Sequence, residues 1–308
     1  MSRTLLSMVF AASMMAQTAG ADGPNVAVDI APVHSLVAQV MEGVGAPTLI
    51  IPANASPHED NLRPSEAAAL QQADLVFWVG DDLTPWLHHG IETLAQNATV
   101  TALLQQPETK LLEFRENAIF ETHTHDHEDH GHEDAHDRHD PHAWLSPQNA
   151  SQWVSIIATQ LSAADPDNAA IYMSNAAAAR ANLDTLIKKI TQTLAPARGG
   201  QFVVFHDAYQ YFETRFDFYA AGAIAISDAA DPSPARIKEI QTRIHADGIE
   251  CILTEPQFNP KLIETVIAGE TIKTAVLDPM GSTLPIGKTL YADMLRNMAE
   301  TLTQCLVD

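Results

Sequence analysis

The chain has 308 residues, of which 17 are basic and 39 acidic, and its net charge is −22 with histidine neutral. A surface this acidic repels polyanions, so we expect neither nucleic acid nor an anionic membrane as a partner. Beyond the N-terminal segment, no stretch approaches the roughly 18 consecutive apolar residues of a membrane-spanning helix. The composition therefore predicts a soluble protein with one large domain or two smaller ones, and no direct membrane insertion.

The first residues have the pattern of a secretory signal peptide. Arg3 precedes the apolar stretch from Leu5 to Ala16, and Ala19-Gly20-Ala21 forms a small-x-small cleavage site. We predict that residues 1–21 are removed on export, which takes away Arg3 and changes the net charge from −22 to −23. No cysteine stands directly after the cleavage site, where Asp22 follows Ala21, so we expect no lipid anchor.

The mature chain contains two cysteines, Cys251 and Cys305. In an exported protein an even pair indicates one disulfide, and the alternative is two buried free thiols. Two cysteines so far from the histidine-rich segment exclude a Cys-based zinc knuckle.

Short apolar runs, separated by helical patterns, indicate an α/β fold. Strands are predicted in the first half at 25–30, 48–51, 74–79 and 99–103, with a helix at 65–73. The second half repeats the pattern, with strands at 202–206, 218–226, 249–255 and 271–278 and helices at 234–246 and 259–268. Near-continuous apolar strands that alternate with helices predict two lobes, each with a mostly parallel sheet flanked by helices.

A long helix is predicted between the halves. Asp165 can cap it, Pro166 suits its first position, and Gly199-Gly200 follows its end. One apolar stripe runs along it at helical spacing, formed by Leu183, Ile187, Ile190 and Leu194.

These elements divide the mature chain into an N-terminal lobe at 22–164, a linker helix at 165–197 and a C-terminal lobe at 198–308. A helix of about 29 residues is a rod of about 40 Å, enough to span two lobes. We expect this single stiff connection to limit lobe movement. Ligands bind beyond the carboxyl ends of parallel strands, so the cleft between the lobes is the expected site.

Half of the 14 histidines lie in one segment, ETHTHDHEDHGHEDAHDRHD at 121–140. Eight of its twenty residues are acidic and none is a large apolar residue, so we expect a disordered loop within the N-terminal lobe. Imidazole and carboxylate at this density bind divalent metal loosely, although solvated tracts without a metal look similar. The secondary weak sites would be formed by His123, His125, His127, His130, His132, His136 and His139.

Four further residues of metal-binding type come from both halves of the chain. His58 follows a strand of the first half, and His142 follows the acidic tract. His206 and Asp278 each end a strand of the second half. A residue of this kind alone more often has a structural role than a metal-binding one. Three of the four lie just after apolar strands, where a parallel sheet places residues in its functional crevice, and their joint position favours a metal site.

Five segments occur in order: SPHEDNLRPSEAAALQQADLVFWVG, DPHAWLSP, VVFHDAYQYFE, LTEPQF and LDPMGSTLPIGKTLYADML. Together they resemble the zinc-specific, ZnuA-type periplasmic binding proteins of bacterial ABC importers. The resemblance extends from Asn25 to Cys305, and an acidic, histidine-rich insertion before DPHAWLSP is typical of the zinc branch.

The resemblance implies two α/β lobes joined by a long backbone helix, with the metal in the cleft between them. It implies three histidine ligands, His58, His142 and His206. The fourth position varies within the family and is water, Glu59 or Asp278.

The metal expected at these ligands is Zn²⁺. Three neutral imidazoles suit this ion, which four tetrahedral ligands satisfy. Manganese-importing relatives resemble this layout but carry a carboxylate in place of His206, and hard oxygen ligands favour Mn²⁺. The choice of metal therefore depends on His206, while affinity alone does not exclude iron or copper.

Several nearby residues have structural interpretations. We expect Glu255 to hydrogen-bond a ligand rather than bind the metal, and Asp207 to have an orienting or structural role. His34 and the pair His88-His89 are interpreted as packing or surface residues. Packing in the core and at the lobe interface is expected of the four tryptophans, Trp78, Trp86, Trp144 and Trp153.

The function implied by the resemblance is capture of Zn²⁺ in the periplasm and delivery to the inner-membrane permease of an ABC importer. We expect a monomer that is not an enzyme. The resemblance also implies a disulfide, because the Cys251–Cys305 pair matches one found in members of the zinc branch. One alternative is a periplasmic zinc buffer or chaperone without a permease. Another is a secreted zinc hydrolase with Glu59 as its base, but the sequence has no HExxH helix and no nucleophile elbow.

Overall fold

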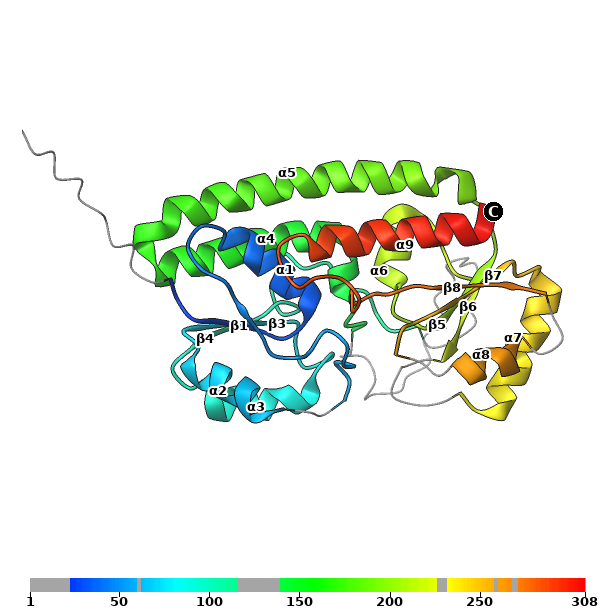
Figure 1. The fold of residues 1–308 in the computed structure, drawn as a ribbon, viewed down its shortest axis with the longest axis horizontal. Coiled ribbons are helices and arrows are strands. Elements are labelled where there is room, and N and C mark those ends of the chain that lie inside the picture. Colours follow the sequence, from blue (N-terminus) through cyan, green and yellow to red (C-terminus); the bar gives the residue numbers. More distant parts are fainter. Residues whose placement is uncertain are drawn as a thin grey trace, which may run out of the picture.

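The computed structural model describes residues 23–59, 62–115, 139–225, 232–257, 260–267 and 271–307, which form two α/β lobes side by side (Figure 1). The first sheet consists of β1 (Val26–Val28), β2 (Thr48–Leu49), β3 (Leu75–Trp78) and β4 (Thr99–Ala102). The second consists of β5 (Phe202–His206), β6 (Gly222–Ala225), β7 (Cys251–Thr254) and β8 (Lys273–Val276). The predicted fold class and all eight predicted strands are confirmed.

The two sheets have the same topology. Their strand orders are β2-β1-β3-β4 and β6-β5-β7-β8, and every pairing is parallel. The inner strands β1, β3 and β5 are buried along their whole length, as near-continuous apolar runs predict for strands covered on both faces. Because the strands of each sheet are parallel, each lobe presents the carboxyl ends of its strands at one edge.

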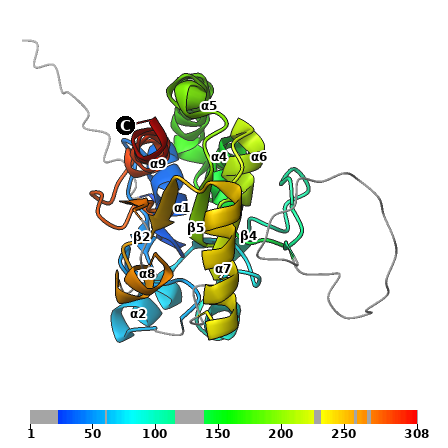
Figure 2. The same ribbon diagram turned by 90° about the vertical axis from the view of Figure 1, so that its right-hand side faces the viewer.

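Helices cover both faces of the sheets (Figures 1 and 2). One layer contains α1 (Ala31–Val40), α4 (Pro147–Ala164), α5 (Ala169–Leu194), α6 (Gln210–Phe216) and α9 (Leu290–Val307). On the opposite side α2 (Pro64–Gln72) and α3 (Pro85–Leu94) cover the first sheet, and α7 (Pro234–Asp247) and α8 (Pro260–Val266) cover the second. Helices α2, α7 and α8 confirm three predicted helices. Within the described ranges, no helix is both long and apolar enough to cross a membrane.

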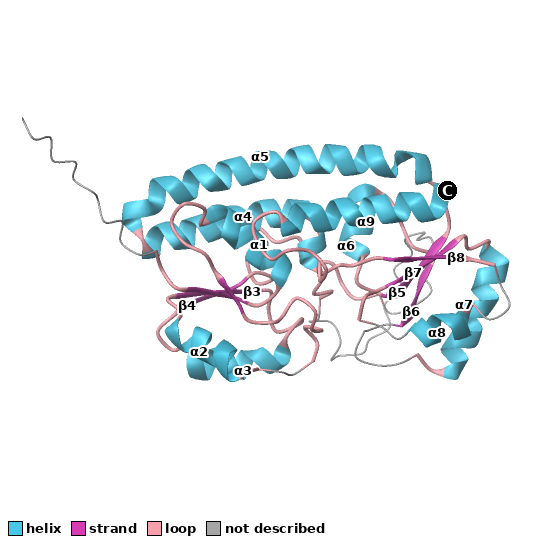
Figure 3. Ribbon diagram, viewed as in Figure 1, coloured by secondary structure: helices cyan, strands magenta, loops and turns pink. Residues whose placement is uncertain are grey.

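The predicted linker helix is α5, which runs along both lobes (Figure 3). Its 26 residues make a rod of about 39 Å, and 3₁₀ turns at Pro166–Asn168 and Ala195–Ala197 lengthen it at both ends. The Asp165 carboxylate accepts hydrogen bonds from the Asn168 amide at 2.8 Å and the Tyr172 hydroxyl at 2.7 Å. The predicted stripe faces inward, with Leu183, Ile190 and Leu194 buried and Ile187 partly buried.

The lobes are joined by more than this helix, because one hydrophobic cluster extends through both of them. Trp144 of the first lobe donates from Nε1 to the Pro279 carbonyl at 2.8 Å, across the lobe boundary. Tyr291 of α9 donates from its hydroxyl to the Trp144 carbonyl at 2.7 Å and from its backbone N–H to Ser35 Oγ of α1 at 3.0 Å. These buried contacts tie α9 to the first lobe and support the expectation of limited lobe movement. The exact lobe boundaries stay predictions.

A disulfide fastens α9 to the second sheet. Cys251, the first residue of β7, is bonded to Cys305 of α9, and their Cα atoms are 5.9 Å apart. Both residues are buried. The predicted pairing is confirmed, and the alternative of two free thiols is wrong.

Removal of this bridge should destabilise the protein without removing metal binding, because neither cysteine belongs to the candidate ligand set. The bridge joins residues 54 apart, for which chain-entropy estimates give about 4 kcal/mol, or a fall in Tm of about 7 °C. Thermal melting of Cys251→Ser/Cys305→Ser beside the wild type measures this. Two reactive thiols in denatured, unreduced wild type would contradict the pairing.

Candidate metal centre

The three histidines expected from the sequence lie together where the lobes meet. His142, just before the 3₁₀ turn Ala143–Leu145, is the middle one: its ring centroid is 5.7 Å from that of His58 and 5.4 Å from that of His206. His206 ends β5, as predicted, and both it and His142 are buried, whereas His58 is half-buried. The structure therefore brings together imidazoles that lie far apart in the sequence and come from both lobes.

These spacings are close to those of a zinc site with three imidazoles. A Zn–N bond of about 2.0–2.1 Å and a ring radius of about 1.1 Å put two tetrahedral ligand centroids about 5.2 Å apart. The observed centroids are slightly farther apart than this. Among the described residues, no group of three or more His, Cys, Asp or Glu side chains is arranged to hold a metal ion as it stands. His142 is thus a close neighbour of both His58 and His206, although the three rings do not form a closed coordination sphere.

His142 is held by Asp140. One carboxylate oxygen, Oδ1, lies 2.7 Å from Nδ1 of His142 and accepts the backbone N–H of the same residue at 3.0 Å. Asp140 is 2% exposed, and burial raises the pKa of its carboxyl to about 7. This contact orients the ring and occupies Nδ1, which leaves Nε2 as the nitrogen that could bind a metal.

His206 is held in the same way by Glu255. Nδ1 of His206 lies 2.5 Å from Oε1 of Glu255, a buried residue that directly follows β7. The other carboxylate oxygen accepts a hydrogen bond from the Gln257 amide at 2.8 Å. The prediction that Glu255 hydrogen-bonds a ligand is therefore supported by its contact with His206. A carboxylate behind a ligating imidazole is the common arrangement around protein-bound zinc.

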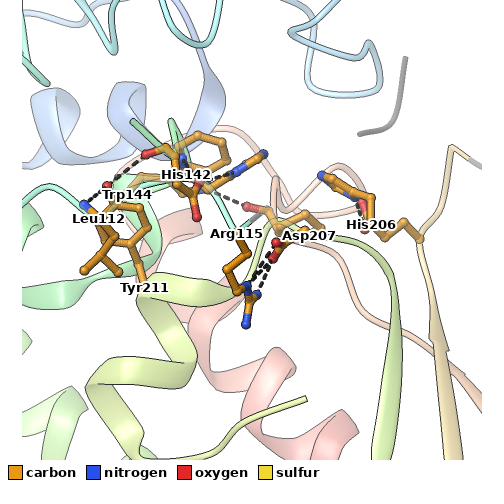
Figure 4. Close-up of polar contacts among 10 residues, drawn as sticks. Leu112, Arg115, His142, Trp144, His206, Asp207 and Tyr211 are labelled. Atoms are coloured by element: carbon orange, nitrogen blue, oxygen red, sulfur yellow. Dashed lines mark hydrogen bonds and ion pairs between the residues drawn. The ribbon is translucent and has the colours of Figure 1, made fainter. Parts of the chain in front are cut away.

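Arg115 joins the two halves of the centre by ion pairs that the sequence analysis missed (Figure 4). Its Nε lies 3.0 Å from both carboxylate oxygens of Asp207, the neighbour of His206, and its Nη1 lies 2.7 Å from Glu213 of α6. Burial raises the pKa values of Asp207 and Glu213, the latter to about 7, while the guanidinium opposes the shift. The structural role expected for Asp207 is thus to pair with the first lobe.

Tyr211 of α6 makes a second link between the lobes beside the centre (Figure 4). Its hydroxyl accepts the backbone N–H of Leu112 at 3.0 Å and donates to the Asp140 carbonyl at 2.8 Å. The Asp140 N–H in turn donates to the Leu112 carbonyl at 2.9 Å. The segment that carries Asp140 and His142 therefore rests directly on the second lobe.

The histidine-rich tract lies mostly outside the described residues, which exclude 116–138. The flexible loop and the weak sites at its histidines stay predictions. Its last two residues are described and differ from a solvated tract: His139 forms an antiparallel bridge with Glu113, and Asp140 is buried against His142. The boundary at 140 was therefore wrong, because Asp140 belongs to the centre.

The two carboxylates expected as possible fourth ligands have different surroundings. Asp278 is half-buried, and its oxygens accept the Met280 N–H at 3.0 Å and the Ser282 hydroxyl at 2.8 Å, which stabilises the turn after β8. Glu59 is exposed and directly follows His58. The hydrogen bonds described for Asp278 thus lie within its own turn.

The other residues singled out by sequence have the structural roles expected of them. His34 is buried, with Nε2 3.0 Å from the Pro47 carbonyl, and burial lowers the pKa of its imidazole. His88 and His89 are exposed, and Asp81 and Glu92 raise the pKa of His88. Three of the tryptophans are buried, and the fourth, Trp86, is partly buried on the main hydrophobic cluster.

The model of the family described as the periplasmic zinc-uptake complex component A, ZnuA, matches residues 26–305. The chain belongs to the ZnuA family. The high-affinity zinc uptake system protein ZnuA of Brucella abortus (strain 2308) is 39% identical, over 98% of this chain and 97% of that protein. The protein of the same name from Paracoccus denitrificans (strain Pd 1222) is 41% identical, over 97% of this chain and 98% of that protein.

Solved structures show the same fold as this member of the ZnuA family. A crystal structure of ZnuA has a TM-score of 0.76 at 22% identity, over 92% of this chain and 99% of that chain. Zn(II)-bound AdcA from Streptococcus pneumoniae has a TM-score of 0.70 at 25% identity, over 93% of this chain and 58% of that chain.

Asp140→Asn should weaken zinc binding about tenfold, because outer carboxylates that orient a ligating imidazole typically contribute this much to metal affinity. The fold should persist, since the shape of the side chain is preserved. Zinc titration against a competing chelator measures the change. Asp165→Asn is the matched control, because it alters another hydrogen-bonded carboxylate, at the end of α4. Equal zinc affinities in the two variants would contradict the role of Asp140.

Proposed function

We propose that the protein captures Zn²⁺ between its lobes in the periplasm and delivers the ion to the membrane permease of an ABC importer. The observation that carries this proposal is the meeting of three imidazoles from both lobes, with carboxylates behind two of them. Membership of the ZnuA family supports it, as do the relatives named as high-affinity zinc uptake proteins. Zinc is the cargo here, so reversible binding is required.

The proposed ligands are His58, His142 and His206, with Nε2 as the ligating atom of the two buried residues. We propose water or Glu59 at the fourth position ahead of Asp278. The Asp278 oxygens already accept two hydrogen bonds within their own turn, and binding a metal would disturb these. Three imidazoles and one oxygen complete a tetrahedron for zinc.

His206→Glu should lower zinc affinity and shift the preference toward Mn²⁺. The change removes a positioned nitrogen ligand and supplies carboxylate oxygen, which suits the harder ion. The new carboxylate would also face Glu255. The repulsion between these two negative charges would favour binding of any cation, so it should not change the ratio of zinc affinity to manganese affinity. Competition titrations with both metals measure the ratio of affinities.

Asp278→Ala is the comparison variant for that experiment. With water or Glu59 as the fourth ligand, this variant should keep the zinc affinity within a few-fold of the wild type. A comparable loss of zinc affinity in His206→Glu and Asp278→Ala would make Asp278 an obligatory ligand. An unchanged zinc-to-manganese ratio in His206→Glu would refute the assignment of His206.

The proposed setting of this function is the periplasm, reached through a signal peptide at residues 1–21, which lie outside the described part of the chain. The ZnuA family consists of periplasmic solute-binding components, and we propose that this member acts as a monomer without enzymatic activity. Its partner would be the permease of an ABC importer, which works with an ATPase.

Growth under zinc limitation tests the transport function. A strain without the protein should grow poorly in chelated medium and recover with added zinc, because uptake needs both capture and a permease. Expression of the wild type should restore growth, and expression of His142→Ala should not. Normal growth of the deletion strain in chelated medium, with tight zinc binding in vitro, would instead identify a periplasmic zinc buffer.

A further inference from the structure

The three proposed ligands are supported in different ways. His142 and His206 are buried, and a buried carboxylate holds each ring. His58 is half-buried on the loop between β2 and α2. The position of its ring also depends on how this loop is held.

The loop is held at the peptide bond that joins Pro57 to His58. Nε1 of Trp86 donates a hydrogen bond to the Pro57 carbonyl at 2.8 Å. The His58 N–H, at the other end of the same peptide bond, donates to Ser56 Oγ at 3.2 Å. Because the peptide unit is planar and the φ angle of Pro57 is fixed by its ring, these two bonds set the direction in which His58 leaves the backbone.

Trp86 lies on α3, which is anchored independently of the loop. Leu87 and Ile91 of this helix are buried in the main hydrophobic cluster. Leu62, at the far end of the loop, is partly buried against the same cluster. Helix α3 and the end of the ligand loop are therefore anchored in one hydrophobic cluster.

We propose that Trp86 is a positioning residue for the zinc site, which holds His58 in its ligating position through the Pro57 carbonyl. This inference rests on the proposed function, because it takes His58 as a zinc ligand. The indole N–H acts through the backbone of the loop and does not touch the metal. When it is lost, His58 should leave zinc more readily, while His142 and His206 keep their carboxylate supports.

Trp86→Phe tests this role, because it keeps an aromatic ring on α3 and removes the donor. Zinc dissociation, followed by stopped-flow mixing of zinc-loaded protein with excess chelator, should be about fivefold faster than in the wild type, which is the effect of one ordinary hydrogen bond. Incorporation of 3-benzothienylalanine at position 86 replaces the N–H by sulfur and keeps the shape of the ring. This replacement should raise the rate of zinc dissociation by the same factor. It tests the role of the indole N–H even if Trp86→Phe folds poorly.

Trp153→Phe is the matched control. Trp153 is buried, and its Nε1 donates to Thr109 Oγ1 at 2.9 Å, so the same donor is lost away from the ligand loop. This variant should lose thermal stability and keep the wild-type rate of zinc dissociation. An equal increase in dissociation rate for both variants would show a general loss of stability and overturn the positioning role.

A double-mutant cycle with His58→Ala separates this inference from the proposed function. His58→Ala should weaken zinc binding, and addition of Trp86→Phe should then change the dissociation rate less than twofold. The inference alone would be overturned if Trp86→Phe raised the zinc dissociation rate as much in the His58→Ala protein as in the wild type. It would also be overturned if Trp86→Phe left the dissociation rate of the wild type unchanged. Unchanged zinc binding in His58→Ala would overturn the ligand assignment itself.

Discussion

The proposed zinc site depends on two hydrogen bonds, each between a buried imidazole and a buried carboxylate. One joins His142 to Asp140, and the other joins His206 to Glu255. Each pair lies within one lobe: the first is local in sequence, and the second joins the ends of the neighbouring strands β5 and β7. Each lobe therefore orients its own imidazole before the lobes meet. The spacing between the two rings then depends on how the lobes are placed relative to each other.

That placement is fixed by contacts on two sides of the interface. Tyr291 and Trp144 connect the lobes beneath α9, and Arg115 and Tyr211 connect them beside the centre. The buried ion pairs of Arg115 with Asp207 and Glu213 are in themselves weak evidence for a stabilising contribution. Loss of the guanidinium, however, would leave two buried carboxylates without a counter-charge, which should destabilise the interface between the lobes. With the shared hydrophobic cluster, these contacts oppose wide opening of the lobes. Of the three histidines, His58 is the least buried.

The sequence predicted the features that have local or repeated signals. The apolar runs identified eight strands, the stripe from Leu183 to Leu194 identified the long helix, and resemblance assigned the three histidines. Helix α1 was harder to predict, because it is buried on nearly every side, and periodicity alone does not assign a short, buried apolar run to a helix or a strand. Helix α4 does carry the expected spacing, at Ala150, Val154, Ile157 and Leu161 in its buried face, and was therefore predictable.

The supporting residues of the centre were harder to find by sequence. Asp140 continues an acidic, histidine-rich pattern, and only its burial beside Tyr211 separates it from that tract. It does stand two residues before His142, a spacing at which a carboxylate can reach the imidazole. Arg115 had no such signal, because its partners Asp207 and Glu213 are 92 and 98 residues away. Anomalous diffraction at the zinc edge from zinc-loaded crystals tests the central claim most directly. We expect the strongest peak about 2.0–2.1 Å from ring nitrogens of His58, His142 and His206. A strongest peak at other residues, with these three imidazoles unligated, would contradict it.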